Sequence, residues 1–251
     1  MILGKFNIFF FFIFILVYSG CERTTDPLDP QVLGYNYTPL AVGKQWIYKT
    51  DSIFFTKTNI ILRDTVSNYT LVKVVDTVIN VFGETEYALD FFKSDAAEGP
   101  WFFVDNSFIT INKSMMIKTE FGLDFIAFTY PVKKFVRWNG VSRFSNKNSI
   151  LIRGEFYEPF SYWDGDTYFY KNILSKDVID FKTYDDVVQL EEVNYEDALN
   201  KIYAESRYAK NIGLIYREFW LLKTQIDDMS MPWDNKAERG LVLTQKLHSY
   251  N

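Results

Sequence analysis

The chain has 251 residues with a formal net charge of −5, and aromatic residues make up 19 % of it. This charge balance offers no broad basic surface, so the composition excludes an ordinary nucleic-acid binder. With one cysteine and one histidine, an intramolecular disulfide is excluded and zinc-type ligands are scarce. We therefore expect no metal site and no cofactor.

The first twenty residues have the proportions of a signal peptide. Lys5 precedes an apolar run over 8–17, and Ser19 and Gly20 place two small residues before Cys21. The run is shorter than the roughly 20 residues that a transmembrane helix needs, and the order of charged, apolar and small residues is that of a secretory signal. We predict an N-terminal signal helix over 1–20.

Cys21 directly after Ser-Gly resembles the lipobox of bacterial lipoproteins, in which this cysteine carries the lipid; Tyr18 stands where Leu is usual. The alternatives are an ordinary signal peptide with an incidental cysteine, or an uncleaved anchor. Each buried acyl CH₂ contributes about 0.8 kcal/mol, so several chains would hold the protein firmly. The resemblance implies a lipid anchor at Cys21, the membrane as a partner, and a place in the bacterial cell envelope, with the outer membrane expected.

Residues 21–36 are rich in Thr, Asp and Pro, which oppose both helix and strand. This composition predicts a flexible tether. The rest of the chain, 37–251, is predicted as a single β-rich domain.

Alternating residue types predict a strand over 45–54, and aromatic and β-branched residues throughout the chain favour strands over helices. A helix is an alternative near 195–202, where apolar residues also have helical spacing. The other strands are predicted at 59–62, 69–82, 86–93, 101–104, 107–111, 115–119, 125–130, 150–157, 167–174, 187–193, 201–208, 214–222 and 240–250.

Ten to fourteen strands with short connections predict a mainly β fold. We expect an antiparallel curved sheet that forms a barrel, a half-barrel or a sandwich. A membrane-spanning barrel is disfavoured, because one strand carries charge at both alternating sets of positions, as at Lys73 and Asp76.

A seven-residue interval from proline to tryptophan occurs twice, at Pro39–Trp46 and at Pro131–Trp138. One interpretation is an internal duplication with a join near 128–140; the other is two unrelated turns that each enter a strand. In both interpretations the two tryptophans are structural anchors.

Several stretches of the mature chain resemble uncharacterised envelope lipoproteins of the Bacteroidetes group. The resemblance implies an envelope location and a β-rich domain, and it brings no assigned activity. The stretches are Tyr37-x-Pro39-Leu40-x-Val42-Gly43-x-x-Trp46-x-Tyr48, Trp138-Asn139-Gly140, the run 208–218, and Gly240-Leu241-Val242-Leu243.

The leading functional hypothesis is non-enzymatic binding of a hydrophobic or glycan ligand, or of another envelope protein. Aromatic faces stack on sugars and fill apolar cavities, so a cluster of aromatics could line such a groove; core packing is the alternative. The candidate binding residues are Trp101, Phe103, Tyr157, Tyr162 and Trp163.

The alternative functions are a carboxylate-based glycan hydrolase and a purely structural scaffold. The chain has no catalytic motif, since Cys21 is predicted to be lipidated and His248 has no recognisable nucleophile near it. Glycosidases need two carboxylates that converge across a cleft. The candidates are Asp164, Asp166, Asp185, Asp186, Asp227, Asp228 and Asp234.

Three short Asp-Ser/Thr-aliphatic patterns resemble O-glycosylation sites of Bacteroidetes. They would place glycans on Ser52, Thr65 and Thr77. The pattern is short and is common in β-rich sequence.

Overall fold

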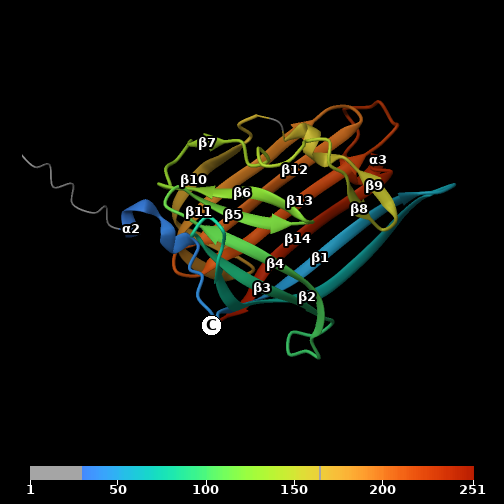
Figure 1. The fold of residues 1–251 in the computed structure, drawn as a ribbon. Helices are drawn as coiled ribbons and strands as arrows, with labels where there is room; N and C mark the ends of the chain where they lie inside the picture. The colour runs from blue at the N-terminus through green and yellow to red at the C-terminus, as the bar shows by residue number, and fades with distance from the viewer. Residues whose placement is uncertain (1–29, 164) are drawn as a thin grey trace, which may run out of the picture.

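The computed structural model describes residues 30–163 and 165–251 (Figure 1). The predicted signal helix, Cys21, the tether up to residue 29, and Asp164 lie outside the described residues.

Fourteen strands and four short helical segments are present among the described residues. The helical segments are α2 (Pro30–Leu33), η1 (Tyr35–Tyr37), η2 (Pro159–Tyr162) and α3 (Trp233–Lys236). The strands are β1 (Gln45–Lys57), β2 (Ile61–Ile79), β3 (Thr85–Ser94), β4 (Phe102–Ile111), β5 (Met115–Glu120), β6 (Leu123–Thr129), β7 (Arg137–Trp138), β8 (Ile150–Ile152), β9 (Glu155–Tyr157), β10 (Tyr168–Ile179), β11 (Lys182–Glu196), β12 (Asn200–Ala209), β13 (Gly213–Lys223) and β14 (Arg239–Tyr250).

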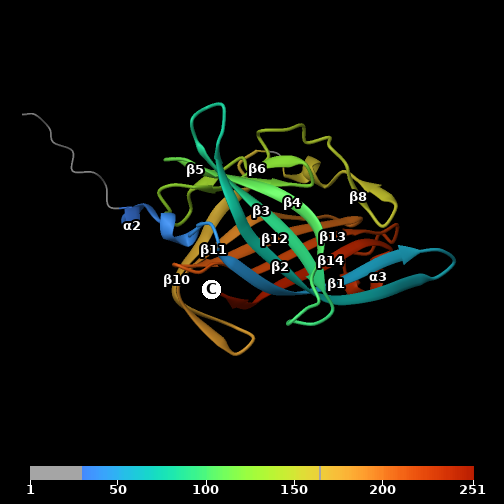
Figure 2. The ribbon, with the colours of Figure 1, turned by 60° about the horizontal axis from the view of Figure 1, so that its bottom comes forward.

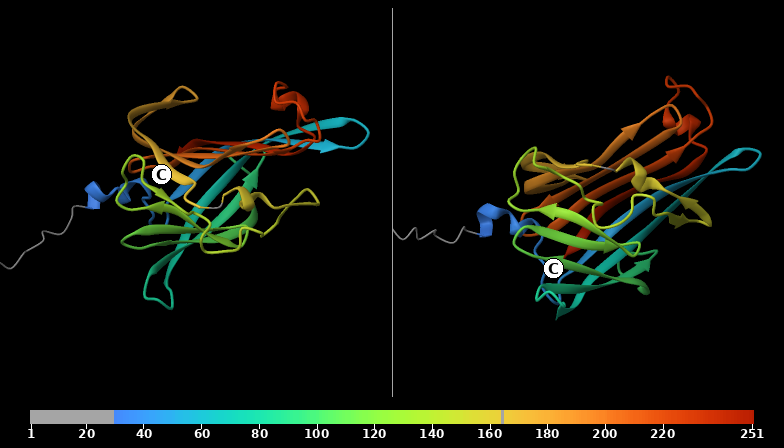
Figure 3. Two further views of the ribbon diagram at one scale, coloured as in Figure 1. Left: turned by 90° about the horizontal axis from the view of Figure 1, so that it is seen from above. Right: turned by 45° about the horizontal axis from the view of Figure 1, so that its top comes forward.

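Twelve of these strands form one sheet in the order β6-β5-β4-β3-β2-β1-β14-β13-β12-β11-β10-β7. Each strand pairs antiparallel with its neighbours, and the first strand pairs with the last, as at Trp46 and Tyr250. The sheet curls until its two ends face each other, so the architecture is a nearly closed barrel (Figures 1 and 3). The other two strands, β8 and β9, pair only with each other.

Alternation along β1 explains how the sheet has an inside and an outside. Trp46, Tyr48, Thr50 and Ser52 are buried, and the residues between them are more exposed. Near the end of β1, Phe55 packs in a second, smaller cluster that also contains Trp233 of α3. In Figure 3, α3 lies over the outer face of the sheet.

The seam between β6 and the β7–β10 end is closed by a few hydrogen bonds. The indole N–H of Trp138 donates to the carbonyl of Ile126 at 2.7 Å, and the Ile126 N–H donates to the carbonyl of Gly140 at 2.8 Å. The Tyr170 hydroxyl donates to the carbonyl of Thr129 at 2.6 Å. Side chains therefore complete a barrel that strand pairing alone leaves open.

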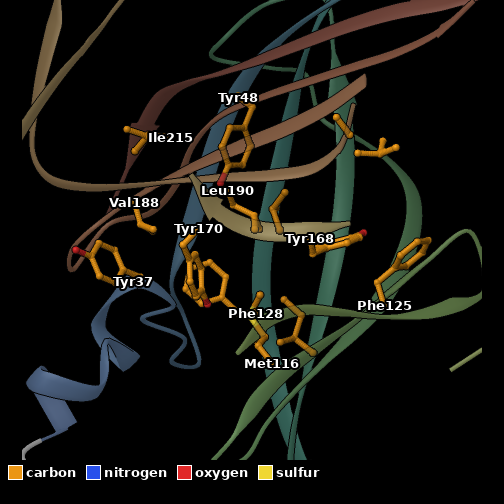
Figure 4. Close-up of a cluster of buried hydrophobic side chains, with 14 of the residues drawn as sticks. Tyr37, Tyr48, Met116, Phe125, Phe128, Tyr168, Tyr170, Val188, Leu190 and Ile215 are labelled. Atoms are coloured by element: carbon orange, nitrogen blue, oxygen red, sulfur yellow. The ribbon is translucent and has the colours of Figure 1, made fainter. Parts of the chain in front are cut away.

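The main core draws on strands all around the barrel, including β1, β6 and β10. Figure 4 shows Phe128 and Met116 from one side of the barrel facing Tyr170, Val188 and Leu190 from the other. Phe128 packs edge-on against Tyr170 at a centroid distance of 5.3 Å. Aromatic pairs in this geometry stabilise a core beyond the area they bury.

The mainly β prediction is confirmed, and of its three forms the barrel is the one observed. The predicted strands at 59–62 and 69–82 are one long strand, β2, which continues through Arg63 and Asp64. The strands predicted at 101–104 and 107–111 are likewise one strand, β4. Polar residues do not interrupt these strands, because one face of each is exposed to solvent.

One further difference concerns local structure. Residues 150–157, predicted as one strand, form the hairpin of β8 and β9 with Arg153 and Gly154 at positive φ in its turn. The strand predicted at 201–208 is confirmed as β12, and the alternative helix is not observed there.

The last residues of the predicted tether are helical and contact the barrel. The carbonyl of Leu33 accepts from Val132 N–H at 3.0 Å, and the Tyr35 hydroxyl donates to the carbonyl of Lys113 at 2.8 Å. Figure 2 shows α2 at the end of the barrel from which the N-terminal segment leaves. Within the described part of the chain, no helix has the length and apolar character to cross a membrane.

The pairing of β1 with β14 joins two sets of strands in the sheet, β1–β6 on one side and β10–β14 on the other. The segment between these halves, residues 130–167, carries β7, the β8–β9 hairpin and η2. The two-half organisation with a join near 128–140 stays a prediction. The equal Pro-to-Trp intervals alone do not establish a duplication.

Candidate functional site

A cavity of about 400 Å³ borders the main core, and Phe125, Phe160 and Trp163 belong to both. This volume is within the roughly 300–1,000 Å³ range of small-molecule sites. Its lining combines apolar side chains with a few charged ones. The lining residues are Phe54, Lys93, Lys118, Glu120, Phe121, Phe125, Ala127, Ile150, Leu151, Ile152, Arg153, Phe160, Trp163, Tyr168, Glu192, Ser206, Tyr208, Leu214, Arg217, Phe219, Leu241 and Leu243.

The β8–β9 hairpin forms one wall of the cavity, through Ile150, Leu151 and Ile152. Arg153, in its turn, makes an ion pair with Asp64 of β2 and lies 3.8 Å from the ring centroid of Phe54. A guanidinium over an aromatic face is an attractive contact. The tip of the hairpin is therefore held to the barrel by Arg153, and Ile150 and Tyr157 at its base belong to the main core.

An ion cluster lies at the cavity wall opposite β8. Alternation along β5 turns Lys118 and Glu120 inward, and Arg217 reaches the same place from β13. Arg217 Nη1 donates to Glu120 Oε1 at 2.7 Å, and Lys118 Nζ donates to Glu120 Oε2 at 3.1 Å. Burial by itself would raise the pKa of Glu120, but Arg217 and then Lys118 outweigh it and hold that pKa well below its ordinary value.

A β-bulge brings Glu192 to the same cavity. The register of β11 shifts between Glu191 and Val193, so Glu192 is the extra residue of the bulge. Its Oε1 accepts from Ser206 Oγ at 2.6 Å. Bulges are common beside functional sites because they redirect a side chain. Burial works against the charged form of Arg217, but Glu120 and then Glu192 outweigh it and raise that pKa further.

Two tyrosines complete the polar part of the lining. Burial, with the charge of Glu192 adding to it, raises the pKa of Tyr168 and of Tyr208 well above the ordinary value. Both phenols therefore stay protonated at neutral pH and can donate a hydrogen bond.

The aromatic wall comes from η2 and the strands around it. Trp163 packs edge-on against Phe160, with centroids 5.2 Å apart, and Phe160 against Phe125 at 5.5 Å. Trp163 also faces Phe219 at 6.2 Å. The buried indole N–H of Trp163 has no hydrogen-bond partner among the described residues. The rings pack against one another, and the cavity borders one side of this aromatic cluster.

Of the five predicted binding residues, only Trp163 lines the cavity. Tyr162 stacks on Tyr195 at a centroid distance of 4.5 Å, and the buried Tyr157 donates its hydroxyl to Glu155 at 3.0 Å. Phe103 is 57 % exposed beside Phe92, and Trp101 is half-buried before β4. The fold does not bring these five side chains together.

Sequence reasoning missed the charged residues of the cavity. Lys118, Glu120 and Arg217 lie in strands that were predicted, and alternation put Lys118 and Glu120 on one face. The sequence signal for an inward charged pair was that Lys118 and Glu120 lie on the same strand face as the buried Met116. No signal in the sequence indicated that Arg217, nearly a hundred residues further along the chain, forms an ion pair with Glu120.

The carboxylates named for a hydrolase do not converge in this cavity. Among the described ones, none lines it; all but Asp228 are exposed, and Asp185 and Asp186 lie in β11 and Asp234 in α3. In residues 30–163 and 165–251, no group of three or more His, Cys, Asp or Glu side chains is placed to hold a metal ion.

The three predicted glycosylation positions differ in accessibility. Thr65 and Thr77 are exposed on β2. Ser52 is 7 % exposed and faces the barrel interior, so a glycosyltransferase cannot reach its hydroxyl in the folded protein.

No protein-family model matches the sequence, and no curated protein matches it. Among solved structures, the chain is similar to a "putative lipoprotein" from Parabacteroides distasonis, with 11 % sequence identity and a TM-score of 0.38. The alignment covers 86 % of this chain and 98 % of that one. A TM-score of this size supports no argument about function.

Proposed function

We propose that this protein is a lipid-anchored envelope protein whose barrel binds a small ligand. The observation that carries the proposal is the cavity of about 400 Å³, which has apolar walls and a few converging polar groups. Binding sites for small molecules commonly have this construction.

The charged groups of the cavity are better suited to ligand binding than to glycan hydrolysis. A glycosidase needs a carboxylic acid whose pKa is raised, so that it can donate a proton near neutral pH. Glu120 is held in the opposite state, because Arg217 and Lys118 both stabilise its carboxylate. Glu120, the inward carboxylate with two cationic partners, is therefore not suited to act as a general acid.

The anchor is proposed from the sequence. A signal-like run that ends in Ser19-Gly20-Cys21 supports lipidation of Cys21 and placement in the cell envelope, with the outer membrane as the expected site. Labelling cells with radioactive palmitate tests this. The label should enter the wild-type protein and be absent from Cys21→Ala, whereas equal labelling of the two would contradict the proposal.

The cavity is tested with a neutral solvatochromic dye. Nile red should bind the full-length protein in lipid nanodiscs, with a blue-shifted emission above that of empty nanodiscs. Ala127 lines the cavity, so Ala127→Trp fills part of it and should remove the added signal. An unchanged signal in a folded Ala127→Trp protein would show that the dye binds elsewhere and that the cavity is not a ligand site.

The two exposed threonines remain a separate proposal. Mass spectrometry of the native protein should find glycan on Thr65 or Thr77 and none on Ser52. Bare peptides at both threonines would contradict the proposal.

A further inference from the structure

The ion cluster in the cavity has more hydrogen-bond donors than it uses. Within the described chain, the Arg217 side chain donates once, to Glu120, and Lys118 donates once, to the same carboxylate. A guanidinium has five N–H donors and an ammonium has three, and neither can accept. About 18 % of the Arg217 side chain and 24 % of Lys118 are exposed, and both line the cavity.

The acceptors in the same place are few. Both oxygens of Glu120 are already engaged. Glu192 has one oxygen bonded to Ser206 and is not among the ion-pair partners of Arg217. The protonated hydroxyls of Tyr168 and Tyr208 each add one donor and one oxygen that can accept, so they do not remove the excess of donors on Arg217 and Lys118. An acceptor-rich group on a ligand would satisfy this excess of donors.

The charged residues of the cavity lining also favour a ligand with an acceptor-rich group. It contains four cationic residues, Lys93, Lys118, Arg153 and Arg217, against two carboxylates, Glu120 and Glu192. Arg153 is paired with Asp64 outside the lining, and Lys93 makes no ion pair within the described chain. In a protein of net charge −5, the cavity is therefore a local positive region.

The remaining lining is suited to an apolar body. Phe54, Phe121, Leu151, Leu241 and Leu243 lie on the lining with no polar side-chain atom. Burying apolar surface of a ligand against them contributes roughly 25 cal/mol per Å².

We propose that the cavity binds an amphipathic organic acid, with its carboxylate received by Arg217 and Lys118 and its apolar body held by the aromatic and aliphatic walls. This inference rests on the proposed ligand-binding function and specifies the class of ligand. A carboxylate can accept two parallel N–H bonds from a guanidinium, which makes Arg217 the principal partner. Glu120 holds Arg217 and Lys118 in place before the ligand arrives.

The test uses three probes with one body and different head groups. They are 4-phenylbutyrate, 4-phenylbutanol and 4-phenylbutylamine, titrated calorimetrically into the full-length protein in nanodiscs, with empty nanodiscs subtracted. We expect the acid to bind about tenfold or more tighter than the alcohol, because a hydrogen bond to a charged group contributes about 1.5–3 kcal/mol. The amine should bind most weakly.

Variants then locate the carboxylate. Arg217→Gln and the milder Lys118→Gln should each reduce the preference for the acid over the alcohol, because affinity for the acid falls more than affinity for the alcohol. Arg207→Gln is the matched control, because Arg207 of β12 pairs with Glu205 of the same strand and with Asp177 of β10, and does not line the cavity. It should keep the full preference.

Equal affinity for the acid and the alcohol in the wild type would overturn this inference and leave Nile red binding, and hence the proposed function, intact. A preference that survives both folded cavity variants would overturn it as well. If neither Nile red nor any of the three probes binds, the proposed function itself fails.

Discussion

Two ion clusters on neighbouring strands show how differently the two faces of the barrel use charge. On the outside, Arg207 donates to Glu205 at 2.9 Å and to Asp177 at 3.0 Å, and Lys171 lies 2.7 Å from Glu191. On the inside, two cations share the single carboxylate Glu120. The outer cluster has three carboxylates for two cations, and the inner cluster has one for two.

The difference indicates different roles. Each carboxylate of the outer cluster is already paired, and Glu205, which is 2 % exposed, accepts from both Arg207 and Tyr203, so that cluster needs no further partner. Cations in excess on the inside face a cavity, where each unused donor costs more free energy than at the surface. A buried ion cluster is weak evidence for stability as such. We therefore interpret the inner cluster as part of a binding site and the outer one as structural.

The largest expected effect comes from Glu120→Gln. This change leaves Arg217 and Lys118 without the carboxylate between them, and we expect the free energy of unfolding to fall by about 3 kcal/mol. Urea denaturation followed by circular dichroism measures it. A loss no larger than that of an exposed ion pair would show that the inner cluster is well hydrated and is not a partly buried network.

Acid should reveal the same carboxylate. Glu120 has a folded-state pKa below its ordinary value of 4.5, so its contribution to stability is complete above that pH and is lost as the pH falls below it. Between about pH 4.5 and 3, the wild type should lose up to about 1.4 kcal/mol per pH unit more than Glu120→Gln. Parallel acid curves for the two proteins would contradict this.

Arg207→Gln should have a smaller effect, about 2 kcal/mol, because it removes charged hydrogen bonds to Glu205 and Asp177 but leaves Lys171 near Glu205. The same urea measurement applies. Ligand affinity should not change, and a change would mean that the outer cluster is coupled to the cavity.

Trp138→Phe should cost about 1 kcal/mol, since it removes the indole bond to Ile126 that helps to close the seam. Hydrogen exchange of amides in β6 should also become faster. If the stability is unchanged, backbone bonding at Gly140 suffices for the seam.

Trp163→Phe should cost about 1 kcal/mol less than Trp138→Phe, because both changes remove the same ring volume but the buried N–H of Trp163 has no partner among the described residues. The two Trp→Phe variants are compared in one thermal denaturation series. A loss as large as that of Trp138→Phe would show that the Trp163 indole makes a bond through water.

Alternation along single strands was readable in the sequence, and it predicted β1, β3, β13 and β14 close to their observed bounds. Where turn residues interrupt a pattern, prediction was less accurate. Arg63-Asp64 lies within β2 rather than at its end, and the polar residues before Ser107 lie within β4, because exposed faces of long strands tolerate charge.

The binding residues were harder to predict for a related reason. An aromatic-rich segment can face the interior, the surface or a hairpin, and its composition does not distinguish them. Trp163 lines the cavity whereas Phe103 is exposed, although both come from aromatic clusters. Whether an aromatic lines a site depends on strand register and on the bulges that shift it, as at Glu192.

The sequence by itself determined the class of fold, the strand-forming segments, and the signal-like stretch that points to Cys21, since each depends on local patterns of neighbouring residues. Only the tertiary structure decided that the first strand pairs with the last and that the sheet curls into a barrel. It also brought Lys118 and Glu120 to Arg217, and left a cavity beside them. Contacts between distant strands depend on register and curvature, which no single segment encodes.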